Sequence, residues 1–263
     1  VSYLDAMEQE YHFWMKDADL LSATRISSRH VVLMKDGSVL NRYCDAFDTA
    51  RPESFHADVE LMHNSSQPPA QLYANLRAGA ESGWDYSCRW FKEQADFGTI
   101  HTTEIIPVDL NCLLYHLECT IAEAWHVKGN AIIAAKYETI AAARKQAIHT
   151  YCWNNEAGFY TDYDFVNQQP KQQKTLAAAA ALFFKIATGE QAHAMAAVLE
   201  AEFLKDGGLV ATPYVTGQQW DAPNGWAPLQ WMSIIGLENY GYHSLATTIA
   251  ERWIQLNTDV YKR

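Results

Sequence analysis

The chain has 263 residues, of which 49% are hydrophobic, and its formal net charge is −11. This composition excludes a disordered chain, and the acidic charge argues against nucleic acid or an anionic membrane surface as a partner. The longest apolar run, Leu176 to Phe184, ends at Lys185 and is shorter than the ~20 residues that cross a bilayer.

Helical hairpins make up most of the predicted secondary structure. Apolar residues recur at helical spacing from Leu4 to Trp14, and residues 30–43 are typical of a β-hairpin with Asp36-Gly37 at its turn. Further helices are predicted over residues 53–63, 70–81, 108–127, 130–151, 175–187, 191–205, 227–239 and 242–257, with a second hairpin at 153–163. No composition shift marks a domain boundary, so we expect one all-α domain, a helical toroid or a solenoid.

Five cysteines occur without a CxxC pair: Cys44, Cys88, Cys112, Cys119 and Cys152. An odd number in a chain large enough to fold without disulfides indicates free thiols in a reducing compartment. The sequence therefore predicts a cytoplasmic protein, with the periplasm as the alternative. The ten histidines are scattered, so no metal site is indicated and no cofactor is expected.

Chemically useful side chains concentrate in three loops, where sites on a rigid scaffold usually lie. In the loop from Glu81 to Trp90, Asp85 stands between Trp84 and Tyr86. Burial among aromatic rings disfavours the carboxylate, and a carboxyl group that stays protonated can donate its proton to a departing glycosidic oxygen. Asp85 is therefore a candidate general acid. The alternatives are that it caps a helix or pairs with Arg89.

The other two loops offer candidate sugar contacts. Pro52 stiffens the segment between Arg51 and Glu53, whose donors and acceptors suit sugar hydroxyls. A helix that begins at Pro52 would also explain Glu53. The loop at residues 217–231 combines three Trp with amide side chains and looks like a polyol-binding wall. Its alternative is a helix entry, with Trp226 and Trp231 in the core.

Four stretches resemble motifs of the trehalases, glycoside hydrolase family 37. The second signature of that family is similar to residues 217–230, GQQWDAPNGWAPLQ. Bacterial trehalases are similar at residues 36–43 (DGSVLNRY) with 51–54 (RPES), at 82–90 (SGWDYSCRW) and at 106–111 (IPVDLN). Because order and spacing agree, the resemblance covers essentially the whole chain.

The resemblance implies an (α/α)6 toroid and inverting hydrolysis of the small molecule α,α-trehalose to two glucoses, by an acid and a base ~6.5–9.5 Å apart. It places the general acid at Asp85. If Asp85 proves not to be the acid, Asp109 and then Asp221 are the next candidates to test. The substrate contacts that it implies fall on Arg51, Glu53, Gly83, Gln219, Trp220 and Trp226.

Two parts of the family pattern are not found in this sequence: an earlier signature, and a Gly-rich segment followed by the glutamate base. We therefore expect residues 1–263 to be one toroid domain, truncated at both ends, with the base outside the chain. It would act as a monomer or with the missing segments of the same enzyme. The alternatives are another (α/α)6 carbohydrate-active enzyme, such as a glucoamylase-like hydrolase or an epimerase, and a non-catalytic sugar-binding or structural fragment.

Overall fold

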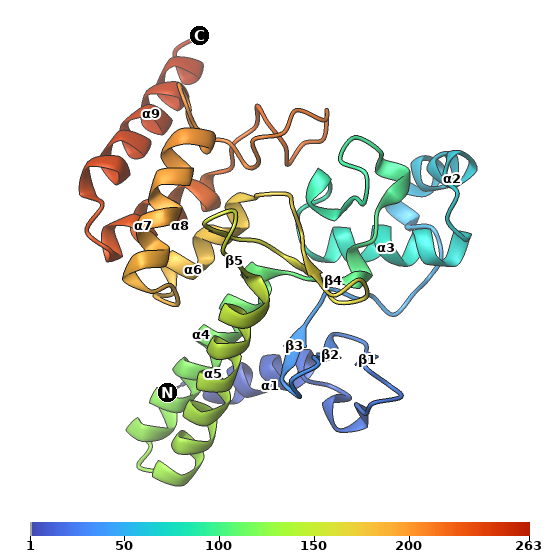
Figure 1. Cartoon of the computed structure of the whole chain (residues 1–263), viewed down its shortest axis with the longest axis vertical. Coiled ribbons are helices and arrows are strands. Elements are labelled where there is room, and N and C mark those ends of the chain that lie inside the picture. The colour runs from blue at the N-terminus through green and yellow to red at the C-terminus, as the bar shows by residue number, and fades with distance from the viewer. Residues whose placement is uncertain (1) are drawn as a thin grey trace.

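The computed structural model describes residues 2–263, and most of this range lies in antiparallel helical hairpins (Figure 1). The all-α class predicted from the sequence is confirmed. No helix within residues 2–263 combines the length and the apolar character needed to cross a membrane. The α-helices of this range are α1 (Leu4–Trp14), α2 (Phe55–Asn64), α3 (Pro69–Glu81), α4 (Val108–Val127), α5 (Ala131–Cys152), α6 (Ala179–Phe183), α7 (Gly189–Val198), α8 (Ala227–Asn239) and α9 (His243–Tyr261).

The α4–α5 hairpin is the long pair of green helices in the lower half of Figure 1, and α1 packs against α4. Gly129 turns the chain between the two helices with φ +78°, and the Asn130 side chain caps α5. Inside the hairpin, Arg144 of α5 donates to the buried Glu118 of α4 at 2.8 Å. This ion pair satisfies a charge that would otherwise be costly to bury.

Helices α6 to α9 form a second group at the upper left of Figure 1, where α6 packs on α8 and α8 on α9. Gly236 allows α8 to pack closely on α6, since a Cβ at this position would lie 2.7 Å from the Cβ of Leu182 in α6. The pair α2–α3 lies at the upper right. The loops between the α6–α9 group and the α2–α3 pair carry the candidate site.

Short antiparallel strands lie in the segments between the helices. The predicted hairpin at 30–43 is confirmed, with Gly37 at φ +86° in its turn. Its sheet has the order β1-β2-β3, from β1 (Ser27–Ser28), β2 (Val31–Leu33) and β3 (Val39–Asn41). The other sheets are β4 (Ile105–Ile106) with β7 (Tyr163–Asp164) and β8 (Gln169–Pro170), β5 (Trp153–Asn154) with β6 (Phe159–Tyr160), and β9 (Leu204–Lys205) with β10 (Gly208–Leu209).

Three predicted elements differ from the structure. The helix expected at 175–187 is reduced to a 3-10 turn and the short α6, because the chain turns at Lys185 with φ +56°. The helix expected at 191–205 ends at Val198, continues as a π-helical turn and then enters β9. The hairpin expected at 153–163 is shorter, because Tyr163 pairs with β4 and β8 instead.

Candidate active site

The end of α3 shapes the loop that carries Asp85. Ser82 Oγ donates to the carbonyl of Gly79 at 2.6 Å and accepts from the Trp84 N–H at 3.0 Å. Gly83 then takes φ +74°, a left-handed conformation that glycine adopts without steric cost. The helix therefore ends in a tight turn that delivers Trp84 and Asp85 to the site.

Tyr86 fixes the other side of Asp85. Its hydroxyl donates to the carbonyl of Leu76 in α3 at 2.8 Å. Its ring lies against Gly79, where a Cβ would come within 2.6 Å of the ring. Asp85 itself is half-buried between two buried aromatic neighbours, and the Asp85–Tyr86 peptide bond is cis. Within the described chain, no hydrogen bond or ion pair is found for the Asp85 carboxyl group.

Arg89 does not pair with Asp85, as one sequence interpretation allowed. Its guanidinium is fully buried and binds Asp109 at 2.6 and 2.9 Å and Asp162 at 2.7 and 2.9 Å. It also lies over the Trp84 ring, 4.8 Å from the ring centre. Burial opposes the charge of Arg89, but the two carboxylates outweigh it and raise its pKa. The Asp85 loop is thereby tied to α4 and to the segment before β7.

Arg51 joins the first loop to the second. It makes a two-pronged ion pair with Asp58 of α2, at 3.0 and 2.6 Å, and lies over the Tyr86 ring, 5.1 Å from its centre. Burial opposes the Arg51 charge, but the hydrogen bond to Asp58 prevails and raises the pKa. Glu53 is exposed in a 3-10 turn that Pro52 begins, which fits the helix-start interpretation of Glu53.

The third loop meets the second through stacked indoles. Trp220 stacks on Trp84 with ring centres 4.9 Å apart, and on Trp226 with centres 4.2 Å apart. Gln219 is exposed, and its side-chain amide donates to the Asp85 carbonyl at 2.7 Å. Trp226 directly precedes α8 and packs half-buried against the core, as the helix-entry alternative allowed, whereas Trp231 is 60% exposed and is not part of the core. The three loops are therefore contiguous.

A cavity of about 190 Å³ opens beside this stack. Gly83, Trp84 and Trp220 line it together with Asp109, whereas Arg51, Glu53, Asp85, Gln219 and Trp226 are not among its lining residues. Aromatic rings next to a carboxylate suit a sugar ring with hydroxyl groups at its edge.

Sequence reasoning missed the partners that hold the site residues in place. Asp58 and Asp162 carry no local signal, because each is defined by an arginine elsewhere in the chain. Asp109 and Asp221 were the next candidates for the general acid, but the carboxylate oxygens of both already accept hydrogen bonds from other residues. Asp109 binds Arg89, and Asp221 accepts hydrogen bonds from four residues around it.

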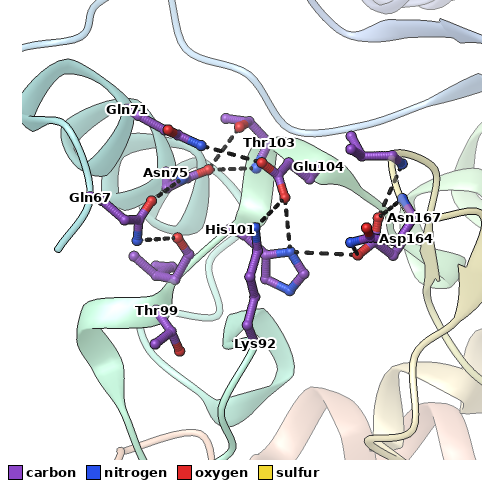
Figure 2. Close-up of polar contacts among 12 residues, drawn as sticks. Gln67, Gln71, Asn75, Lys92, Thr99, His101, Thr103, Glu104, Asp164 and Asn167 are labelled. Carbon is purple, nitrogen blue, oxygen red and sulfur yellow. Dashed lines mark hydrogen bonds and ion pairs between the residues drawn. The ribbon is translucent and has the colours of Figure 1, made fainter. Parts of the chain in front are cut away.

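A second polar cluster lies between the segment after the Asp85 loop and β7 (Figure 2). His101, Glu104 and Asp164 place ligand atoms within 4.8 Å of one another, a spacing that a metal ion could use. Two lysine side chains already contact this cluster. Lys92 pairs with Glu104 at 2.9 Å, and Lys171 Nζ lies 2.9 Å from His101 Nε2.

These contacts explain the cluster without a metal. Burial lowers the pKa of Lys171 to about 8 and lowers that of His101 as well. While Lys171 is an ammonium group, Nε2 of His101 must accept, so the proton of the neutral ring lies on Nδ1 and points to Glu104, 3.3 Å away. We interpret the cluster as a network that ties β7 and β8 to residues 91–104.

One family model and two bacterial relatives match nearly the whole chain. The sequence model of the family described as Trehalase matches residues 1–263. A putative periplasmic trehalase of Salmonella typhi is 44% identical over 99% of this chain and 46% of its own length. A periplasmic trehalase of Xanthomonas campestris is 47% identical over 96% of this chain and 44% of its own length. The chain thus spans less than half the length of these relatives.

The solved structure of neutral trehalase Nth1 from Saccharomyces cerevisiae superposes with a TM-score of 0.72 at 26% identity, over 95% of this chain and 50% of that one. This likeness confirms the expected class, helical hairpins of the (α/α)6 toroid type.

The cytoplasmic location expected from the cysteines is wrong, because the bacterial relatives are named as periplasmic. The five thiols are indeed free, but Cys88, Cys112 and Cys152 are buried. Burial raises the pKa of each of these three thiols, and a protonated, inaccessible thiol resists oxidation. An odd cysteine count therefore does not report the compartment here.

Proposed function

The chain belongs to the trehalase family, and from this premise we propose that it acts in the hydrolysis of α,α-trehalose to two glucoses. The observation that carries the proposal is the meeting of three loops around Asp85: Tyr86 beside Arg51, Trp84 stacked on Trp220, and Gln219 bonded to the Asp85 carbonyl. We also propose that residues 1–263 form a single toroid unit. A periplasmic location, the alternative left open by the sequence, accords with the names of the relatives.

We assign the general acid to Asp85. Its carboxyl group stands between two buried aromatic residues, in a loop that both of the other site loops contact. In an inverting reaction it protonates the glycosidic oxygen while the bond to the anomeric carbon breaks, and water attacks the opposite face of that sugar. Arg51, Glu53, the backbone of Gly83, and the side chains of Gln219, Trp220 and Trp226 bind the sugar.

We propose that the base, which removes a proton from the attacking water, lies outside residues 1–263. The buried carboxylates near Asp85 are already occupied, Asp109 by Arg89 and Asp221 by hydroxyl and amide donors. Because the oxygens of both carboxylates already accept these hydrogen bonds, we assign neither as the base.

The test is glucose release by the full-length gene product, since this chain spans less than half of its relatives. Each trehalose should yield one β-glucose, from the sugar whose anomeric carbon the water attacks, and one α-glucose, which departs with its own anomeric bond intact; NMR before mutarotation observes both. Maltose and an α-mannoside serve as controls. Release of α-glucose alone, or equal cleavage of all three glycosides, would contradict the proposal.

A further inference from the structure

Asp221 is a fully buried carboxylate that follows Trp220 in the third loop. It accepts from the Asp85 loop twice within 3 Å: from Ser87 Oγ at 2.6 Å and from the Cys88 N–H at 2.8 Å. The Cys88 thiol adds a longer contact at 3.4 Å. On its own side it accepts from the hydroxyls of Thr212, at 3.0 Å, and of Thr216. A buried carboxylate with both oxygens occupied in this way has a single favourable position.

Two more hydrogen bonds join the same loops beside Asp85. The Gln219 side chain donates to the Asp85 carbonyl at 2.7 Å, and the Trp220 N–H donates to the Tyr86 carbonyl at 3.0 Å. Three consecutive residues, 219 to 221, therefore form hydrogen bonds to the backbone of the Asp85 loop at positions 85, 86 and 88. Gln219 is exposed and Trp220 is half-buried, so Asp221 is the buried anchor among these three residues.

We propose that Asp221 is a positioning residue, which holds the Asp85 carboxyl group in line with the departing glycosidic oxygen. The inference rests on the proposed role of Asp85 as the acid. A displacement of ~1 Å in a catalytic group can cost ~10²-fold in rate, so loss of the anchor should slow proton transfer even though Asp221 touches no substrate. The proposed contact between Arg51 and the sugar should change little, because Asp58 holds Arg51 separately.

The experiment compares trehalose with α-glucosyl fluoride, whose leaving group needs little protonation. Both substrates are assayed on one preparation of the full-length Asp221→Asn variant, so the ratio of the two kcat values does not depend on how much protein is folded. We expect kcat for trehalose to fall ~10–10²-fold and kcat for the fluoride to fall several-fold less. Thr216→Val, which removes one donor to Asp221, should shift the ratio the same way by a smaller factor.

Asp58→Asn is the matched control, since it alters another buried aspartate that serves Arg51 instead of Asp85. It should leave the ratio unchanged and raise KM. Equal losses on both substrates in Asp221→Asn and in Thr216→Val would mean that Asp221 is only structural, and the inference would be overturned. If the wild-type protein does not cleave trehalose, or if Asp85→Asn leaves the ratio unchanged, the proposed function itself fails and the inference falls with it.

Discussion

Arg51 and Asp58 form a buried ion pair in which Nε and Nη2 of the guanidinium reach the two carboxylate oxygens at 3.0 and 2.6 Å. Asp58 also accepts from the Arg51 backbone N–H at 2.8 Å. Two of the three guanidinium nitrogens thus bind Asp58. The orientation of the Arg51 side chain, which we propose binds the sugar, therefore depends on a residue of α2.

Removal of this pair should weaken both stability and binding. Asp58→Ala leaves a buried arginine unpaired, so we expect the free energy of unfolding to fall by ~3–5 kcal/mol, measured by urea denaturation. In the milder Asp58→Asn, KM for trehalose should rise ~10-fold while kcat changes less. Glu138→Gln, which removes an exposed pair with His126, is the control and should cost no more than ~1 kcal/mol. Similar losses in Asp58→Ala and Glu138→Gln would contradict the buried-pair interpretation.

The acid assignment predicts a dependence on the leaving group. Asp85→Asn keeps the shape of the side chain but cannot donate the carboxyl proton, so kcat for trehalose should fall ~10²–10⁴-fold. α-Glucosyl fluoride should be partly spared. Steady-state kinetics of the full-length protein on both substrates checks this. Full trehalose turnover by the variant would remove Asp85 from the mechanism.

The close packing of Tyr86 on α3 predicts a sharp response at Gly79. In Gly79→Ala the new Cβ would lie 2.6 Å from the Tyr86 ring, so the ring must shift, and we expect a loss of ~1–3 kcal/mol. Gly189→Ala is the matched control, because that helical glycine has no atom within 4 Å of the added Cβ. It should be neutral or stabilising by ~0.4–1 kcal/mol. Thermal unfolding of both variants decides, and an unchanged midpoint for Gly79→Ala would refute the contact.

Glu104 predicts how stability depends on acid. Its hydrogen bond to His101, followed by the contact with Lys92, lowers its pKa from 4.5 to about 2. The folded state therefore binds the Glu104 proton more weakly than the unfolded chain does. Its stabilising contribution is complete above pH 4.5 and is lost as pH falls toward 2. Unfolding midpoints between pH 2 and 6 should accordingly drop more steeply for the wild type than for Glu104→Gln; parallel curves would show that the shift is absent.

Thiol titration tests the explanation for the free cysteines. Cys88, Cys112 and Cys152 are buried, whereas Cys44 and Cys119 are partly exposed. With Ellman's reagent at pH 8, the native chain should react quickly at no more than the two exposed thiols, and at all five after unfolding in guanidinium chloride. Rapid reaction of Cys112 or Cys152 in the native protein, identified by mass spectrometry, would show that burial does not protect them.

The sequence by itself determined the elements that depend on neighbours in the chain. Asp36-Gly37 specifies its hairpin because both turn positions must tolerate unusual backbone angles. The helical period from Leu4 to Trp14 specifies α1 for a similarly local reason, and motif resemblance pointed to the residues around Asp85. The local pattern failed in the alanine-rich segment at residues 175–187. There the chain turns at Lys185, and the α-helix is limited to the short α6.

Only the tertiary structure decided which charged groups meet. Arg89 could have paired with Asp85 four residues earlier, yet it binds Asp162, 73 residues away. Asp221 reaches Cys88 across 133 residues. Such pairs leave no period in the sequence, because a buried charge selects whichever opposite charge or donor the fold brings within hydrogen-bond distance. The residues proposed to do the chemistry could thus be found from sequence, while the residues that hold them could be found only from the fold.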